Sequence, residues 1–440
     1  KALACRIAVT LKHPESDDWA IKCRLVAKDL KCKRKVDPVE SYAGVPSLKA
    51  FRMLLAACGH KRISTADLIT AYLQQDDFDE GKKLLIKFWH PVKQEWVYVY
   101  IRGWIYGCIP AGAGWKKTFK IWMESIGFRE ILNGESIYVS GHQPEHADGK
   151  EVTDSKLCPA GVTVSCFVDD PAIFAETADS EKWFHDALDA RFDCKHHSYL
   201  SKANPIEYCG TRITFNDEWE VKQDNVLFIE RMLEERHMTG CNGCRTPITK
   251  GTLNRLTLAA QEERYLEGDD VTCFRSGLGQ LHWLASTTHP KLCPAHSMLA
   301  SYTAKPVEGC LEAIKAACRY LAGVKLDCLT MQPDNHSGLL VSTDSDWAGE
   351  WGNTGDVKSR SGGLITLNGM PVDWWSAKQV SIATSSGDAE SRALATGVGR
   401  GLQAQYLAEE LQITTSPKVK IQVDSPAAIG FARNMVEEAR

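Results

Sequence analysis

In the sequence of 440 residues we expect neither a membrane-spanning segment nor a secretion signal. No apolar run approaches the roughly 18 residues of a membrane span. The longest candidate, residues 97–114, is interrupted by Arg102, and residues 53–58 are too few. We expect no cleavable signal in these first residues, because Arg6 follows only a short apolar stretch. We therefore expect no membrane partner. Because the first residue is Lys1 rather than Met, we expect a fragment or a processed piece.

The sixteen cysteines lack the spacing of a disulfide framework. They are scattered, and several, such as Cys58, Cys166 and Cys318, lie inside apolar segments, which is typical of reduced intracellular thiols. Cys241 and Cys244 have zinc-knuckle spacing, but no second CxxC or His pair follows at a ligand distance. We interpret this pair as a turn with two thiols, with a structural zinc site as the less favoured alternative.

Internal repeats, low-complexity segments and a strong net charge are also absent. A composition of 44% hydrophobic and 25% charged residues excludes wholesale disorder, and at about 150 residues per domain the length predicts two to four folding units. The net charge is −4, yet residues 1–62 alone carry +8, which leaves −12 for the rest. A basic N-terminal lobe could bind a phosphate backbone while an acidic body holds cations. The alternative is that the basic residues 31–35 form a solvated turn.

Helical and strand-like patterns alternate along the chain. Apolar residues at helical spacing predict helices over residues 47–58, 114–126, 181–192 and 228–238. Runs of β-branched and aromatic residues predict strands over 62–68, 97–101 and 208–215, the last of which continues through Asn216-Asp217 into a hairpin with 218–222. A further hairpin is predicted over 162–175, and the polar residues 141–160 are expected to form an exposed insertion.

The rest of the chain divides at a linker-like stretch, residues 332–338. Before it, residues 240–270 are expected to be rich in loops, with helices around 273–286 and 311–321. After it, the pattern predicts strands over 339–344, 362–367 and 372–376, then a helix over 386–411, a strand over 419–423 and a helix over 426–434. This order predicts a compact α/β module of about 100 residues.

Two groups of carboxylates could bind metal ions. Asp67 ends a predicted buried strand, and Asp169-Asp170 lies at the tip of a predicted hairpin. If these elements are neighbours, the three acids could hold two Mg²⁺ ions, which activate a 3′-hydroxyl and stabilise a pyrophosphate leaving group. The alternatives are that Asp67 caps a helix and that Asp-Asp-Pro is an ordinary turn.

The second group lies in the C-terminal module. Asp344 and Asp424 end strands, and Asp388 and Glu390 open the long helix. Acids in these positions could meet at one rim of a sheet and hold two Mg²⁺ ions for hydrolysis of a phosphodiester. For Asp388 the alternative is a capping box with Ser385.

These residues fall in short motifs that follow one order along nearly the whole chain. Before residue 211 the motifs are Lys22-Cys-Arg-Leu-Val-Ala-Lys28, Val36-Asp37 through Ser41-Tyr-Ala43, Ala66-Asp-Leu-Ile-Thr-Ala-Tyr-Leu73, Ile105-Tyr-Gly107 with Trp115, Phe167-Val-Asp-Asp170 and Tyr208-Cys-Gly210. In the C-terminal module they are Ser342-Thr-Asp-Ser-Asp-Trp-Ala-Gly349, Lys358-Ser-Arg-Ser-Gly-Gly363, Ser385-Ser-Gly-Asp-Ala-Glu390 and Asp424-Ser-Pro-Ala-Ala-Ile429. Together they resemble the reverse transcriptase–ribonuclease H portion of a copia-type LTR retrotransposon polyprotein.

The resemblance implies an α+β fold: a right-hand polymerase with fingers, palm and thumb, followed by an RNase H-like α/β domain. The implied boundaries are residues 1–235 for fingers and palm, 236–335 for thumb and connection, and 336–440 for a C-terminally truncated RNase H-like domain. The implied activity is RNA-directed DNA polymerisation with cleavage of hybrid RNA, in a replicating element whose polyprotein also carries protease and integrase regions.

The resemblance also implies a role for individual residues. Asp67, Asp169 and Asp170 would hold the polymerase metals, Arg24 and Lys22 would bind the incoming triphosphate, and Tyr72 would exclude a ribose 2′-hydroxyl. Tyr208, Cys209 and Gly210 would form the primer grip. Asp344, Asp388 and Asp424, with Glu390, would be the ribonuclease H metal ligands.

The implied cofactors and partners follow from that activity. Each active site would take two Mg²⁺ ions, with Mn²⁺ as a substitute. The partners would be an RNA template, a DNA primer, the RNA/DNA hybrid and dNTPs, and the location would be the cytoplasm within a virus-like particle, or the nucleus.

Three departures from the family pattern keep other functions open. Pro110 replaces a Gln expected near the nascent base pair, Asp388 replaces a Glu, and the chain ends at Arg440 before the fourth ribonuclease H carboxylate. One alternative is a catalytically decayed copy that binds nucleic acid without turnover. Another is a stand-alone nuclease that uses only residues 339–440.

Overall fold

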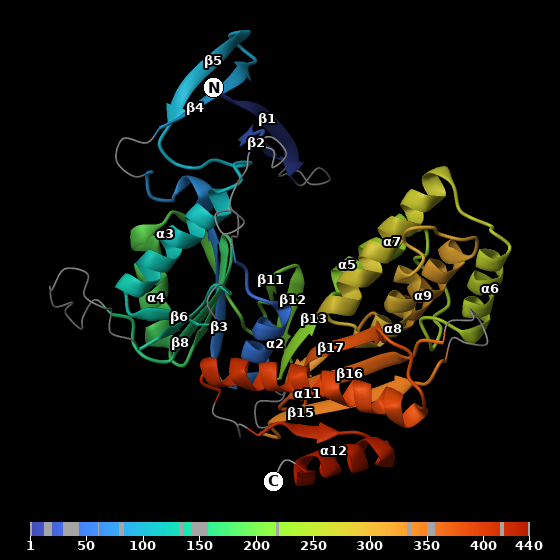
Figure 1. Cartoon of the computed structure of the whole chain (residues 1–440). Coiled ribbons are helices and arrows are strands. Elements are labelled where there is room, and N and C mark those ends of the chain that lie inside the picture. Colours follow the sequence, from blue (N-terminus) through green and yellow to red (C-terminus); the bar gives the residue numbers. More distant parts are fainter. Residues whose placement is uncertain are drawn as a thin grey trace. The chain divides into compact units, whose positions relative to one another are not determined.

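The computed structural model describes residues 2–12, 20–29, 44–59, 61–78, 83–131, 135–141, 157–216, 220–331, 336–349, 357–413 and 418–438. The chain forms two compact units, one of residues 1–47 and 61–199, the other of residues 48–60 and 200–440 (Figure 1). Helix α2 (Leu48–Ala57) therefore belongs to the second unit, although it interrupts the first in sequence. Within the described ranges, no helix combines the length and apolar character that a membrane crossing requires.

The first unit contains two sheets. The four-stranded sheet has the order β2-β1-β4-β5 and consists of β1 (Leu3–Lys12), β2 (Ala20–Ala27), β4 (Leu84–His90) and β5 (Glu95–Ile101). The six-stranded sheet has the order β10-β3-β9-β8-β7-β6. Its strands are β3 (Arg62–Leu68), β6 (Phe128–Ile131), β7 (Ile137–Ser140), β8 (Val162–Phe167), β9 (Asp170–Ala175) and β10 (Cys194–Tyr199).

Two helices, α3 (Ala111–Ser125) and α4 (Ala178–Arg191), cover one face of the six-stranded sheet (Figure 1). Trp115 and Phe119 of α3 and Phe184 of α4 share one buried core with inward-facing strand residues. Helix α4 begins after Thr177, whose side chain accepts a hydrogen bond from the backbone amide of Ser180 in a capping box. The aromatic core therefore holds the sheet that carries Asp67, Asp169 and Asp170.

The second unit combines a helical layer with a small sheet. The sheet has the order β11-β12-β13-β14 and consists of β11 (Ile206–Tyr208), β12 (Thr211–Phe215), β13 (Val221–Asp224) and β14 (Leu329–Met331). The helices are α5 (Val226–Glu235), α6 (Lys250–Gln261), α7 (Gly268–Thr287), α8 (Cys293–Ala300) and α9 (Cys310–Val324), and residues from all five contribute to one core.

The C-terminal module of this unit is a four-stranded sheet with two helices. The sheet has the order β17-β16-β15-β18 and consists of β15 (Leu339–Asp346), β16 (Arg360–Leu367), β17 (Met370–Lys378) and β18 (Lys420–Gln422). Strand β15 pairs antiparallel with β16 and parallel with β18. Helices α11 (Ser386–Glu410) and α12 (Pro426–Glu438) complete the element order that the sequence predicts.

Two local predictions are wrong, and a third is confirmed only in part. Residues 240–270 contain α6, because Leu256 and Ala259 are buried in the helical core and Thr249 caps the helix start. The strand predicted over 208–215 is two strands, since Cys209 and Gly210 both adopt positive φ and form a turn between β11 and β12. In the predicted exposed insertion, Gly141, Pro159 and Ala160 are exposed as expected, whereas Cys158 is 5% exposed and packs in the aromatic core of the first unit.

Other predictions lie outside the described residues. They are the middle of the insertion (142–156), the basic stretch 31–35, the motif residues 36–43, the hairpin turn from 217 and the first part of the linker (332–335). Every cysteine that the structure describes is a free thiol. Cys241 and Cys244 gather no third metal-ligating side chain among the described residues.

Candidate active sites

Strand β3 carries Asp67 to the tip of the β8–β9 hairpin. Thr65 of β3 lies opposite Ala172 of β9, and the same antiparallel register, continued by two residues, puts Asp67 opposite Asp170. The backbone amide of Leu68 donates a hydrogen bond to the carbonyl of Asp169 at 3.2 Å. The structure therefore brings the three predicted polymerase carboxylates together. Asp67 lies within a strand and does not cap a helix.

Burial and neighbouring like charge raise the pKa of both Asp169 and Asp170. Displacement of water by the surrounding protein raises the pKa of Asp170 to about 6, and the charges of Asp169 and Asp67 add to the effect. Burial raises the pKa of Asp169, and the negative charge of Asp67 raises it further. The backbone amide of Asp169 and two cations, Lys22 and Arg24, act in the opposite direction. A divalent cation would relieve this repulsion, and carboxylate oxygens are the donors that Mg²⁺ prefers. The residue types therefore suit Mg²⁺, although Asp67, Asp169 and Asp170 are not among the described groups whose ligand atoms all lie within 4.8 Å of one another.

The hairpin turn that carries Asp169 has a strained backbone. Phe167 pairs with Asp170, which leaves Val168 and Asp169 as the two turn residues. Val168 has φ 58°, which is unfavourable for a β-branched side chain. The indole N–H of Trp115 on α3 donates a hydrogen bond to the carbonyl of Val168 at 2.6 Å. Helix α3 therefore holds the turn in the conformation that presents Asp169.

Basic and phenolic side chains face the same carboxylates. The predicted substrate residues Lys22 and Arg24 both lower the pKa of Asp169, so their charges act at this site. Burial raises the pKa of Tyr72, and Asp169 raises it further. The structure adds Tyr106, whose ring centroid lies 5.3 Å from that of Tyr72 and 5.3 Å from the Arg24 guanidinium carbon. Tyr106 belongs to the Ile105-Tyr-Gly107 motif, but nothing in the sequence alone assigned it a role.

Gly107 follows Tyr106 and packs closely against the backbone at the end of strand β2. Its φ is 82°, and a Cβ atom there would lie 2.3 Å from the carbonyl oxygen of Ala27. The amide of Ala27 donates to the carbonyl of Tyr106 at 2.7 Å. Glycine is therefore required here to bring Tyr106 close to the strand that carries Arg24. Pro110, three residues on, occupies the N-cap of α3, where its missing N–H is tolerated.

A row of exposed aromatic rings lies on the β4–β5 hairpin. Trp96, Tyr98 and Tyr100 alternate along β5 and are 52%, 57% and 67% exposed. Trp89 lies across from Trp96 with ring centroids 5.9 Å apart, and the ammonium of Lys87 lies 5.2 Å from the Trp96 ring. The hairpin thus exposes large apolar rings beside a cation.

In the second unit, the predicted primer-grip residues lie at the tight turn between β11 and β12. Tyr208 ends β11 and is buried, while Cys209 and Gly210 form the turn to β12. A pocket beside the turn is lined by residues that include Gly210, Arg212 and Trp283. Arg212 donates two 3.2 Å hydrogen bonds from Nε to Asp224, another residue of the pocket wall.

The C-terminal module brings three carboxylates together. Ligand oxygens of Asp344, Glu390 and Asp424 all lie within 4.8 Å of one another. Glu390 is 9% exposed, and its Oε1 accepts hydrogen bonds from the backbone amide and hydroxyl of Ser345 at 3.0 and 2.8 Å. Its Oε2 is buried without a hydrogen-bond partner. An unpaired buried carboxylate oxygen among two further acids is the donor set that a divalent cation would satisfy.

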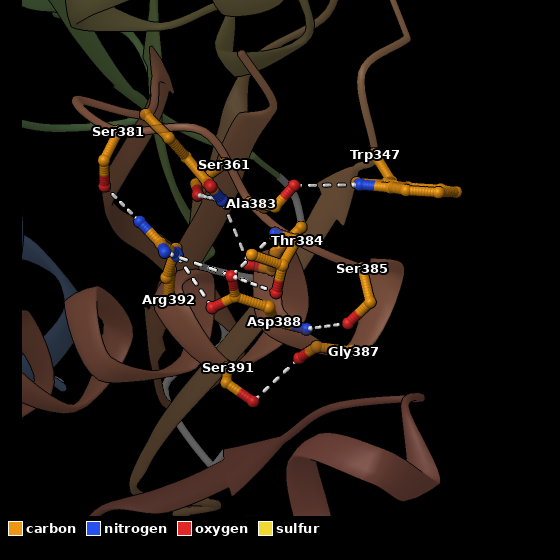
Figure 2. Close-up of polar contacts among 12 residues, drawn as sticks. Trp347, Ser361, Ser381, Ala383, Thr384, Ser385, Gly387, Asp388, Ser391 and Arg392 are labelled. Carbon is orange, nitrogen blue, oxygen red and sulfur yellow. Dashed lines mark hydrogen bonds and ion pairs between the residues drawn. The ribbon is translucent and has the colours of Figure 1, made fainter. Parts of the chain in front are cut away.

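Asp388 lies outside this cluster. Its carboxylate pairs with the Arg392 guanidinium at 2.8 Å and accepts from the backbone amide of Thr384 at 2.9 Å (Figure 2). Arg392 and Thr384 hold the pKa of Asp388 at about 2. The Ser385 hydroxyl accepts from the Asp388 amide at 3.1 Å, as expected from the capping alternative. The structure therefore favours Glu390 over Asp388 as the third member of the cluster.

A strand and a neighbouring hairpin tip that present three carboxylates to basic and tyrosine side chains have the arrangement of a metal-dependent phosphoryl-transfer site. The chain belongs to the reverse transcriptase (RNA-dependent DNA polymerase) family, whose model matches residues 1–250.

The chain is also similar to retrotransposon polyproteins of plants. It is 26% identical over 421 residues to the Retrovirus-related Pol polyprotein from transposon RE2 of Arabidopsis thaliana, a match that covers 95% of this chain and 27% of that protein. It is 25% identical over 446 residues to the RE1 polyprotein of the same plant, covering 100% of this chain and 28% of that protein. It is 24% identical over 426 residues to the transposon TNT 1-94 polyprotein of Nicotiana tabacum, a match that covers 95% of this chain and 30% of that protein. The identification with copia-type elements is therefore confirmed, and the chain spans less than a third of these relatives.

Proposed function

We propose that this chain is an RNA-directed DNA polymerase that extends a DNA primer on an RNA template. The observation that supports this most directly is the convergence of Asp67, Asp169 and Asp170 at one hairpin tip, with the charges of Lys22 and Arg24 acting on Asp169. Two Mg²⁺ ions held there would activate the primer 3′-hydroxyl and stabilise the leaving pyrophosphate. Mn²⁺ would substitute for Mg²⁺.

Each group of side chains in the site has its own role in this proposal. Asp67, Asp169 and Asp170 provide oxygen ligands. Arg24 and Lys22 bind the triphosphate, for which a planar guanidinium is well suited. Tyr72 excludes a ribose 2′-hydroxyl, and Tyr106 holds the Arg24 guanidinium in place through the face of its ring.

The proposed partners follow from two features, an exposed aromatic row and the β11–β12 turn. The aromatic row of Trp96, Tyr98 and Tyr100 is suited to stacking with unpaired template bases. The turn at Tyr208, Cys209 and Gly210 is proposed to contact the primer. By resemblance to the family, we assign residues 1–235 to fingers and palm, 236–335 to thumb and connection, and 336–440 to an RNase H-like domain. The proposed location is a cytoplasmic virus-like particle or the nucleus.

Primer extension on a poly(rA)/oligo(dT) template tests the polymerase proposal. We expect Mg²⁺-dependent dNTP incorporation by the native chain, and a loss of at least about 1000-fold in Asp169→Asn, because a metal ligand is removed. Asp179→Asn, at an exposed position of α4, is the matched control and should retain activity. Equal incorporation by Asp169→Asn and native protein, or none by a folded native chain, would reject the proposal. In the second case, hybrid binding with a steep salt dependence would favour the decayed copy.

A second activity, cleavage of RNA in an RNA/DNA hybrid, is favoured by the cluster of Asp344, Glu390 and Asp424. The buried, unpaired Oε2 of Glu390 is the specific observation. Divalent ions bound there would activate the attacking water. The same cluster supports the stand-alone nuclease alternative, which differs in needing only residues 339–440.

Hybrid cleavage by two acid variants tests this assignment. Glu390→Gln should lose at least about 100-fold of the cleavage rate with Mg²⁺ or Mn²⁺ because it removes a ligand. Asp388→Asn, two residues away, should stay within about threefold of native, because its carboxylate serves Arg392 and Thr384. The reverse order of the two variants would return the ligand role to Asp388.

A further inference from the structure

A second kind of ligand set lies in the first unit at the junction of α4 and β10. An oxygen of Asp189, the thiol of Cys194 and a ring nitrogen of His197 all lie within 4.8 Å of one another. The His197 Nε2 is 2.9 Å from Asp189 Oδ2 and 3.0 Å from Oδ1. Oxygen, sulfur and imidazole nitrogen together are donors for a borderline-soft ion such as Zn²⁺ and not for Mg²⁺.

His185 provides an independent observation at the same place. It lies four residues before Asp189 on α4, and therefore on the same helix face. It is 3% exposed, and its ring centroid is 4.2 Å from that of His197. Its Nε2 is 2.9 Å from the Ser64 hydroxyl, whereas its Nδ1 is buried without a partner. A histidine held through one ring nitrogen, with the other unpaired, has the arrangement of a metal ligand with its outer-shell support.

A bulge in β10 explains how Cys194 and His197 reach the same side. Residues three apart in a regular strand point to opposite faces. In β10 the register shifts between Cys194, opposite Leu68, and His196, opposite Asp67. The shift turns Cys194 and His197 toward α4, while Lys195 and His196 lie 3.8 and 3.9 Å from the Asp67 carboxylate.

The hydrogen bonds at this junction leave part of the cluster unexplained. Asp189 contacts the His197 Nε2 and hydrogen-bonds with the Cys194 thiol, but the Nδ1 atoms of both His185 and His197 remain buried and unpaired. Unpaired buried nitrogens are uncommon and unfavourable. A tetrahedral Zn²⁺ with bonds of about 2.0–2.3 Å would hold donors roughly 3.5 Å apart, which this cluster can reach with small movements of side chains.

We propose that Asp189, Cys194 and His197 bind one Zn²⁺ ion, and that the adjoining His185 ring turns toward them to provide the fourth ligand. The site joins α4 to the edge strand that lies beside Asp67, so its role is to hold that strand and its bulge in place. It is separate from the Mg²⁺ sites of the proposed polymerase in both residues and ligand chemistry.

Cobalt substitution of the metal-free full chain tests the proposal. One equivalent of Co²⁺ should bind and give the thiolate-to-metal charge-transfer band and the visible bands of a tetrahedral site, and Zn²⁺ should displace it. Cys194→Ser should lose the charge-transfer band and weaken Zn²⁺ binding by more than about 100-fold, and His185→Gln should weaken it by at least about tenfold. The double variant of Cys241→Ser and Cys244→Ser is the matched control and should keep the band.

Folding is followed separately by far-ultraviolet circular dichroism and thermal unfolding in chelator. We expect Cys194→Ser to match the native spectrum there, and only the native chain and the control to gain thermal stability with Zn²⁺. A charge-transfer band that survives in Cys194→Ser, one lost in the CxxC control, or the absence of stoichiometric binding by the native chain would each overturn the proposal.

Discussion

At the scale of single residues, Asp170 shows how the first site places like charges together. It lies at the start of β9, next to Asp169 and opposite Asp67 along the strand register. Its pKa is raised to about 6, above the ordinary carboxyl value near 4, because water is displaced and two like charges are close. Ionised Asp170 therefore destabilises the folded chain in the absence of a cation.

The pH dependence of this effect has a definite sign. A carboxyl group whose pKa is raised by folding stabilises the folded state below its unfolded pKa, near 4, and loses that contribution as pH rises through about 6. Asp170→Asn removes the ionisation. Without divalent metal, we expect it to raise the free energy of unfolding at pH 8 by up to about 1 kcal/mol, since the side chain is partly exposed and screened.

Urea unfolding of native chain and variant at pH 4 and pH 8 measures this difference. The gain should shrink toward zero at pH 4, where Asp170 is protonated in the folded chain. Asp179→Asn should show no such pH-dependent gain. A gain of equal size at both pH values would contradict the electrostatic explanation.

At the scale of elements, the β8–β9 turn depends on a helix that is distant in sequence. Val168 adopts a conformation that costs about 1–3 kcal/mol for a non-glycine residue. Its carbonyl is held by the Trp115 indole of α3 at 2.6 Å. The β8–β9 turn is therefore shaped by tertiary contact, because the indole N–H of a core tryptophan holds it in position.

Trp115→Phe removes the indole N–H and keeps an aromatic ring. We expect about a tenfold lower kcat for primer extension, because the Asp169 carboxylate is less well positioned, and a loss of about 1–2 kcal/mol in the free energy of unfolding. Trp122→Phe, in the same helix and core, is the matched control. It should lose similar stability but keep kcat, and equal kcat values for the two variants would argue against the positioning role.

At the scale of the whole molecule, helix α2 is separated in sequence from most of its unit. Its segment ends at His60, and the unit resumes at Leu200. Arg52 is 4% exposed and donates to the carbonyls of Val372, Ser286 and Thr287 at 2.8, 2.8 and 3.2 Å. Its guanidinium carbon also lies 4.1 Å from the centroid of the Trp374 ring. This single side chain thus connects α2 to both β17 and α7.

Arg52→Met should destabilise the second unit by about 2–4 kcal/mol, because three buried carbonyls lose their donor. Arg255→Met, at an exposed position of α6, is the matched control and should change stability by less than about 0.5 kcal/mol. The midpoint of urea unfolding, followed by tryptophan fluorescence, gives the comparison. Similar midpoints for the two variants would show that α2 is held by its apolar contacts alone.

Much of the secondary structure was predictable from sequence because its signals are local. Strand β3 has the predicted bounds, Arg62–Leu68, and the C-terminal module has the predicted element order. Alternating or helical hydrophobic spacing specifies such elements without knowledge of their neighbours. Helix α6 escaped prediction because its polar and β-branched residues have weak helix propensity, and its stability comes from burial against α9 and the rest of its core.

The candidate sites were likewise partly predictable from the sequence and partly decided by the fold. The resemblance to the family motifs predicted the acids and, separately, Arg24 and Tyr72, since such motifs can be read along the chain without knowledge of the fold. The choice between Asp388 and Glu390 did not follow from spacing, because both open the same helix. Only the fold decided that one carboxylate serves the helix start and the other meets Asp344 and Asp424. The cluster of Asp189, Cys194 and His197 also became visible only once a bulge in β10 had turned the thiol and the imidazole to one side.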